Sequence, residues 1–167
     1  EHMYLEVEQR DKIELLRKLI NIIKPVKALV FLNKIDLIET LNSKLGFHGI
    51  KTGSLHGTEV KFDRQKAMND FSRGDINVLI ASDLAARGLH IEGISHIFNM
   101  DIPEDPKVYL HRSGRTGRLG LKGIVISLTT AFELSLLKRI EKVLGVKIEH
   151  RVLSHAELSE PHIKIDR

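Results

Sequence analysis

The sequence predicts an α/β fold in which a parallel β-sheet carries helices on both of its faces. Two observations support this prediction: strand and helix signals alternate along the 167 residues, and the strand candidates are short continuous apolar runs. Such runs are typical of strands buried on both faces, and alternation through short loops implies crossovers between parallel strands. A chain of this length suits one domain and is too short for two ordinary ones.

Helical patterns occur in five segments. The first, DKIELLRKLINII (11–23), places Asp11 and Glu14 like a capping box at its start. Its apolar stripe consists of Leu16, Leu19, Ile20 and Ile23. The same spacing, followed by a glycine or a polar loop, predicts further helices over 36–46, 63–74, 105–113 and 131–144.

Five strands are expected between these helices. The apolar runs are ALVFL (28–32), NVLIA (77–81), HIFNM (96–100) and GIVISL (123–128), and GIKTGSLHG (49–57) is a short strand that enters a glycine loop. Ligands of such sheets bind at the carboxyl ends of the strands. The polar segments NKID, SDLAARGLH and TT follow three of the runs, so we expect the site at this edge. The domain is expected over 1–153, and 154–167 is a polar tail or the start of an extension.

Composition narrows the classes of partner. The formal charge of +4, from 26 basic and 22 acidic residues, mildly favours a polyanion. An aromatic content of 5% without tryptophan argues against base stacking as the main binding device. The absence of cysteine excludes disulfides and thiolate metal sites. No apolar run has the length of a membrane span, so we expect a cytoplasmic protein without a membrane partner.

The stretch HRSGRTGR (111–118) crowds three arginines around two glycines. Guanidinium groups bind phosphate oxygens in pairs and stay charged at any relevant pH. The chain contains no phosphate-binding loop of the G-x-x-x-x-G-K-[ST] type. The arginines therefore suggest fingers offered to a nucleotide that another domain or chain holds, and the alternative is a solvent-exposed basic turn.

A longer segment carries a family resemblance. Residues 55–123, LHGTEVKFDRQKAMNDFSRGDINVLIASDLAARGLHIEGISHIFNMDIPEDPKVYLHRSGRTGRLGLKG, resemble the C-terminal RecA-like lobe of DEAD-box ATP-dependent RNA helicases. The likeness runs from about residue 5 to 150. It implies a three-layer RecA-like fold, RNA as partner, and ATP with Mg²⁺ held mainly by an N-terminal RecA-like lobe. The C-terminal lobe alone is then expected to be inactive as an ATP hydrolase.

The resemblance also implies roles for single residues. Arg115 and Arg118 would be arginine fingers on the terminal phosphate of ATP, and His90 would lie at its ribose. The RNA backbone would be contacted by Asn33, Gly57, Arg64, Ser82 and Gly88. Coupling between the lobes would fall to Asp83, Arg87, His111 and Arg112.

Three positions depart from the usual family pattern: His90 replaces an Asp, Lys34 a frequent Thr, and Ser113 a frequent Ile. His90 removes a carboxylate acceptor and so leaves open an RNA- or protein-binding adaptor without helicase activity. A second alternative is the lobe of a related DNA helicase. His111 favours the RNA enzyme, because the DNA relatives commonly carry Gln at that place.

Overall fold

The computed structural model describes residues 1–57, 61–118 and 120–161. Its centre is a seven-stranded sheet with the order β3-β4-β2-β5-β6-β1-β7, and every ladder in it is parallel. The strands are β1 (His2–Glu6), β2 (Ala28–Phe31), β3 (Thr52–Leu55), β4 (Val78–Ala81), β5 (His96–Asn99), β6 (Ile124–Thr129) and β7 (Glu149–His150). A separate antiparallel hairpin joins β8 (Val152–Ser154) to β9 (Glu157–Ser159).

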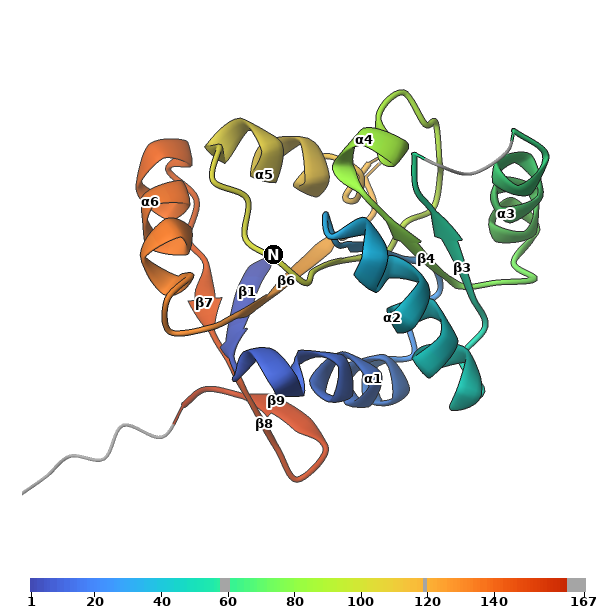
Figure 1. Cartoon of the computed structure of the whole chain (residues 1–167). Coiled ribbons are helices and arrows are strands. Elements are labelled where there is room, and N and C mark those ends of the chain that lie inside the picture. Colours follow the sequence, from blue (N-terminus) through green and yellow to red (C-terminus); the bar gives the residue numbers. More distant parts are fainter. Residues whose placement is uncertain (58–60, 119, 162–167) are drawn as a thin grey trace, which may run out of the picture.

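Helices cover both faces of the sheet, as the sequence predicted (Figure 1). Their bounds are α1 (Lys12–Ile23), α2 (Ile35–Phe47), α3 (Lys61–Arg73), α4 (Asp83–Ala86), α5 (Pro106–Ser113) and α6 (Leu134–Leu144). In Figure 1, α1 and α2 lie below the sheet, whereas α4, α5 and α6 lie above it. The result is a three-layer α/β domain.

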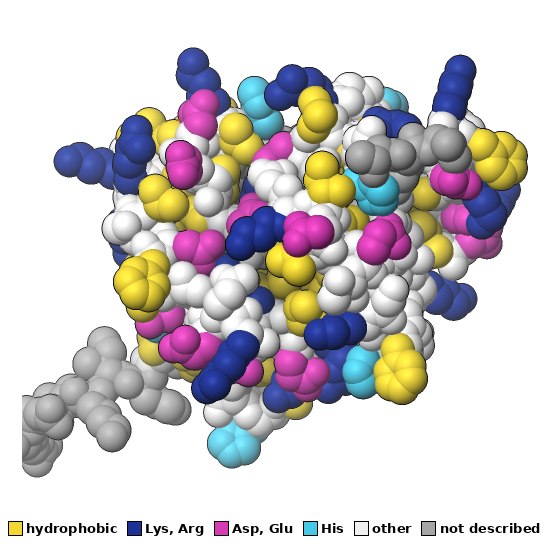
Figure 2. All heavy atoms as spheres, viewed as in Figure 1, with side chains coloured by type: hydrophobic (Ala, Val, Ile, Leu, Met, Phe, Trp, Pro, Cys, Tyr) yellow, Lys and Arg dark blue, Asp and Glu magenta, His cyan; other side chains and the backbone are white. Residues whose placement is uncertain are grey.

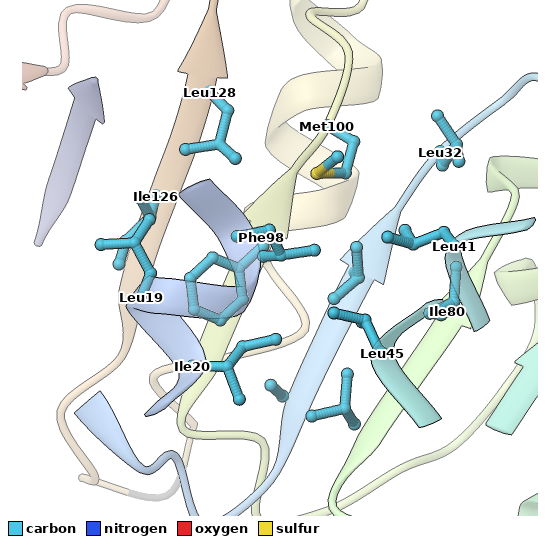
Figure 3. Packing of buried hydrophobic residues seen from close by; sticks show 14 of the residues in the cluster. Leu19, Ile20, Leu32, Leu41, Leu45, Ile80, Phe98, Met100, Ile126 and Leu128 are labelled. Carbon is cyan, nitrogen blue, oxygen red and sulfur yellow. The ribbon is translucent and has the colours of Figure 1, made fainter. Parts of the chain in front are cut away.

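Alternate residues of each strand enter two separate cores. In β2, Val30 packs with α1 and α2 in the first core, while Leu29 and Phe31 face the second core beneath α3 to α6. Figure 3 shows the first core, where Leu19 of α1 lies beside Ile126 of β6. Because strand side chains point alternately to opposite faces, one continuous apolar run fills both cores.

Every predicted strand and helix is present within a few residues of its expected bounds. The short helix α4, the strands β1 and β7, and the β8–β9 hairpin were not predicted. Ser154 ends β8, so the boundary expected at residue 154 falls inside this hairpin, whose Leu153 and Leu158 pack against the first core. Residues 162–167 of the expected tail lie outside the described residues.

The predicted capping box at the start of α1 is wrong. Asp11 belongs to a 3₁₀ turn (Gln9–Asp11) and has helical backbone angles, so its side chain caps nothing. An N-cap requires an extended residue whose oxygen can reach the first turn. Glu14 instead accepts two hydrogen bonds from Arg17. In the described residues no helix is long and apolar enough to cross a membrane.

Candidate functional site

The carboxyl ends of three adjacent strands bring polar residues together. Asn33 follows β2, Asp83 follows β4 and Asp101 follows β5. Asn33 Oδ1 accepts a hydrogen bond from the Asp83 backbone nitrogen (2.9 Å), and its Nδ2 donates to Asp83 Oδ2. The Asn33 backbone nitrogen donates to Asp101 Oδ2 (2.8 Å). Asn33 therefore links both acidic residues, because β2 lies between β4 and β5 in the sheet.

Arg112, in the last turn of α5, is the centre of this network and is 1% exposed. Its Nε and one terminal nitrogen donate to the two carboxylate oxygens of Asp83, both at 2.7 Å. The remaining donors reach Asn99 Oδ1, the Asp101 carbonyl oxygen and Asp101 Oδ1. These bonds match the five N–H groups of a guanidinium. Arg112 is thus fully satisfied and has no donor left for a ligand.

The charge of Arg112 is balanced by the two carboxylates. Burial acts to raise the pKa of Asp83, but the hydrogen bonds and charge of Arg112 and the bond from Asn33 outweigh it. The pKa of Asp83 therefore lies below its ordinary value of 3.8. The guanidinium also lies over the ring of Phe31, with 5.1 Å to the centroid. A planar delocalised cation is suited to this combination of stacking and paired bonds.

The short helix α4 is held by two of the predicted site residues. Ser82 is its N-cap, and Ser82 Oγ accepts from the Ala85 backbone nitrogen (3.1 Å). Arg64, in the first turn of α3, donates to the Ala85 carbonyl oxygen (2.6 Å). Both side chains that were expected at RNA phosphates thus have partners within the chain, and these partners position the loop after β4.

Two glycines expected at RNA lie on open backbone. Gly88 follows α4 with φ +75°, a conformation that favours glycine, and nothing lies within 4 Å of where its Cβ would be. Gly57 follows β3, and a Cβ there would meet nothing nearer than Leu84 Cδ2 at 3.9 Å. Bare backbone at both points leaves room for the close approach of a ligand.

Arg115 and Arg118 meet a different environment from Arg112. Arg115 donates to the Leu89 carbonyl oxygen (2.6 Å) and Arg118 to the Gly114 carbonyl oxygen (2.7 Å). Neither forms an ion pair with a carboxylate in the described part of the chain. Burial, and then the neighbouring charge of Arg118, lower the pKa of Arg115. A guanidinium remains protonated despite such a shift, so two uncompensated positive charges adjoin here.

A cavity of about 200 Å³ lies beside these two arginines. It is lined by residues 90–94, Arg115, Arg118 and Leu121. His90 lies at this cavity, and its Nε2 is 3.2 Å from Glu92 Oε1. The family resemblance predicts a nucleotide contact at His90, and Glu92 places a carboxylate in the same cavity.

A smaller cavity of about 80 Å³ is lined by both Arg112 and Arg115. Its lining includes Arg87, His111, Arg112 and Arg115, together with Asp83. The four residues expected to couple the lobes therefore surround one hollow. Arg87 and His111 are exposed there, whereas Arg112 is buried beneath them.

Sequence reasoning missed four residues of this edge. Asn99 and Asp101 bind Arg112, and the polar residues of NMD at the end of β5 were a signal that could have found them. Lys12, which is buried, and Glu133, which is half-buried, form a further ion pair (2.7 Å). No local pattern marks this pair, because its members are 121 positions apart in the sequence.

The surface shows no single basic patch on the face drawn in Figure 2, where basic and acidic side chains are interspersed. Among the described residues, no group of three or more His, Cys, Asp and Glu could hold a metal ion. In contrast to the interspersed charges of that face, Arg115 and Arg118 line one cavity together.

A family model described as "Helicase conserved C-terminal domain" matches residues 11–120, which is more than half of the chain. The chain belongs to this family. Solved structures of the DEAD-box type match it as well. The E. coli DEAD-box protein SrmB, solved with regulator of ribonuclease activity A, has a TM-score of 0.87 and 34% identity over 97% of this chain and 98% of that one.

The C-terminal domain of the DEAD-box protein Dbp5 has a TM-score of 0.84 and 30% identity over 90% of this chain and 88% of that one. Among curated proteins, the probable ATP-dependent RNA helicase YfmL of Bacillus subtilis is 41% identical over 94% of this chain. CshA of Bacillus cereus is 39% identical over 89%. The chain spans 41% of YfmL and 28% of CshA. The predicted DEAD-box C-terminal lobe with a RecA-like fold is confirmed.

Proposed function

We propose that the chain forms the C-terminal lobe of an ATP-dependent RNA helicase in which Arg115 and Arg118 act as arginine fingers. The observation that carries this proposal is the contrast in charge balance along one stretch. Arg112 is neutralised by Asp83 and Asp101, whereas Arg115 and Arg118 share a cavity and lack an ion pair with any described carboxylate. Two guanidiniums in this condition fit an anionic phosphate.

ATP and Mg²⁺ are proposed to be held mainly by an N-terminal RecA-like lobe. When bound there, they supply the phosphoryl group and a divalent charge that the residues of this chain lack. Arg115 and Arg118 stabilise the negative charge that develops at the terminal phosphate during hydrolysis. His90 lies at the ribose, and Arg87, His111, Arg112 and Asp83 couple the two lobes.

The RNA backbone is proposed to lie across the loops after β2, β3 and β4. Gly57 and Gly88 offer open backbone, Ser82 and Arg64 fix α4, and Asn33 fixes the start of that helix through Asp83. Contacts to phosphate position RNA without reading its sequence. Closure of the lobes bends one strand so that it no longer fits its duplex. A cytoplasmic location is part of the same proposal.

The test is RNA-stimulated ATP hydrolysis by the two-lobe protein. Arg118→Ala is compared with Arg139→Ala. The second variant removes an exposed arginine of α6 that does not line the cavity. We expect Arg118→Ala to lower kcat about a thousandfold, which corresponds to about 4 kcal/mol of barrier. RNA binding is retained in both variants, and Arg139→Ala keeps normal turnover.

Normal turnover by Arg118→Ala contradicts the proposal, and an adaptor lobe then becomes the better interpretation, with His90 as the feature that favours it. A second check uses the chain by itself. Since Mg²⁺ and the phosphate contacts are assigned to the other lobe, we expect no measurable ATP turnover by the isolated chain.

A further inference from the structure

Lys12 is a buried ammonium group that no step of the proposed reaction uses. Its side chain is 1% exposed, and lysine is almost never buried to this extent unless its charge is paired. Nζ donates to the Met100 carbonyl oxygen (2.8 Å) and to Glu133 Oε2 (2.7 Å). Because removing an ammonium from water costs free energy that an apolar side chain avoids, these two contacts require an explanation.

Glu133 is a fixed acceptor for Lys12. Its Oε2 also accepts from the Thr130 backbone nitrogen (2.9 Å) and from Thr130 Oγ1 (3.1 Å). Burial acts to raise the pKa of Glu133, but the bonds and charge of Lys12 and the bonds of Thr130 outweigh it, so the pKa lies below its ordinary 4.5. The carboxylate is therefore ionised at neutral pH and anchors Lys12 to the end of β6.

Met100 lies between two residues that bind Arg112. Asn99 Oδ1 accepts from Arg112, and Asp101 accepts through both its carbonyl and its carboxylate oxygen. Arg112 reaches them from α5, on the side of the second core, whereas Lys12 begins α1, which packs on the first core. The segment 99–101 is thus held between two buried cations from opposite faces of the sheet.

We propose that Lys12 is a positioning residue for the arginine network. By holding the Met100 carbonyl against Glu133, it fixes Asp101 where Arg112 binds it, and so keeps Arg112 between Asp83 and Asp101. Its consequence for catalysis rests on the proposed function, because Arg112 begins the stretch that carries the proposed fingers. A residue that only stabilises the fold would not act selectively on Arg112.

The first experiment measures hydrogen exchange of the Arg112 Nε–H group by NMR in the isolated chain. Lys12→Met is compared with Leu16→Ala, which weakens the same helix through the first core without touching the network. We expect Lys12→Met to accelerate this exchange about tenfold, the factor that corresponds to the loss of one hydrogen bond made by a charged group. Leu16→Ala leaves it unchanged under conditions where both variants are folded. Equal rates in Lys12→Met and the parent chain overturn the proposal.

If Lys12→Met does not fold, the exchange of the Arg112 Nε–H group is measured in Glu133→Gln instead. This variant keeps the volume of the acceptor and removes its charge. The same acceleration is expected, and an unchanged rate overturns the proposal. Failure of both variants to fold also overturns it, since the pair is then a general requirement of the fold.

The second experiment uses the two-lobe protein. Lys12→Met is expected to lower RNA-stimulated kcat about tenfold with little change in the KM for ATP, since it removes the same positioning bond. Leu16→Ala is expected to keep near-parental turnover at a temperature where it is folded, and equal losses in both variants overturn the proposal. Normal turnover by Arg118→Ala would contradict the proposed function and leave the exchange result intact.

Discussion

Arg112 and Arg118 lie six residues apart in one stretch of sequence and meet opposite environments. At the end of α5, Arg112 is 1% exposed and binds Asp83, Asp101 and Asn99. In the loop that follows, Arg118 is exposed and donates to a single carbonyl oxygen. An arginine thus serves as an internal cross-link in the first region, whereas in the second region it has no ion-pair partner among the described residues.

The surroundings of Arg112 and Arg118 show how a structural arginine can be distinguished from one that is available to a ligand. Spacing along HRSGRTGR does not distinguish them, since the arginines recur at equal intervals. Charge balance does, because a guanidinium whose donors are all used has none left for phosphate.

Arg112→Met is expected to lower the free energy of unfolding of the isolated chain by about 3–5 kcal/mol, because it leaves the buried ends of Asp83 and Asp101 without their cation. Urea unfolding measures the change, with the slope m showing that the same surface is exposed. A loss below about 1 kcal/mol would mean that water replaces the guanidinium, and the contrast with Arg118 would disappear.

Asp83→Asn keeps the shape of the acceptor and removes its charge. We expect a loss of about 1–3 kcal/mol at neutral pH, because a hydrogen-bonded buried charge of Arg112 loses part of its compensation. Lys66→Ala on the surface of α3, where the pair with Asp70 is exposed, is the matched control and should cost less than about 1 kcal/mol.

The pH dependence of stability follows from the same carboxylate. Because the folded pKa of Asp83 lies below 3.8, Asp83 contributes stability that is fully present above that value and is lost as the pH falls through the folded pKa. Urea unfolding between neutral and acid pH should show this loss in the parent chain. Asp83→Asn should flatten the acid limb, and an identical acid limb in both proteins would contradict the assignment.

Gly123→Ala tests how the loop that carries Arg118 is held. A Cβ at position 123 would lie 2.4 Å from the Gly117 backbone nitrogen, so the two ends of this loop must move apart. We expect a loss of about 1–3 kcal/mol in urea unfolding, as for other overpacked positions. Gly46→Ala in α2 is the control, since nothing lies nearer than 4.0 Å there, and it should be neutral or slightly stabilising.

Arg118→Met is expected to have the smallest effect on the isolated chain, within about 0.5 kcal/mol of the parent, because the side chain is exposed and has no described ion-pair partner. Urea unfolding beside Arg112→Met gives the direct comparison. A loss as large as that of Arg112→Met would show that Arg118 is structural and would remove the basis of the proposed fingers.

The fold could be predicted where the sequence carries a local period. Continuous apolar runs located β2, β4, β5 and β6, and the stripe with Leu16 and Leu19 located α1. β1 was missed because HMYLE has polar residues at both ends of three buried ones. The β8–β9 hairpin was missed because its strands have only three residues each. Its apolar residues Leu153 and Leu158 pack against the first core, and this contact has no local signal in the sequence.

Most residues of the candidate site could be predicted from the sequence, but their hydrogen-bond partners could not. The family resemblance assigned Arg115 and Arg118 to ATP, Arg112 to coupling between the lobes, and Asn33 and Arg64 to RNA, without naming the contacts of any of them within the chain. The structure adds that Asn33 binds Asp83 and that Arg64 binds the Ala85 carbonyl, which no spacing rule contains. Lys12 and Glu133 are separated by most of the chain, so their pairing had no signal in the sequence.

Periodicity and glycine placement act over a few residues, so the sequence alone was enough to predict most helices and strands, their alternation, and the gathering of polar residues at the carboxyl ends of the strands. Only the tertiary structure decided which arginine is neutralised. That choice depends on strand order, since β2 lies between β4 and β5 and brings Asp83 and Asp101 to one guanidinium. A charge is neutralised by residues that are close in space, and Asp83 and Asp101 come close to Arg112 only when the strands assemble into the sheet.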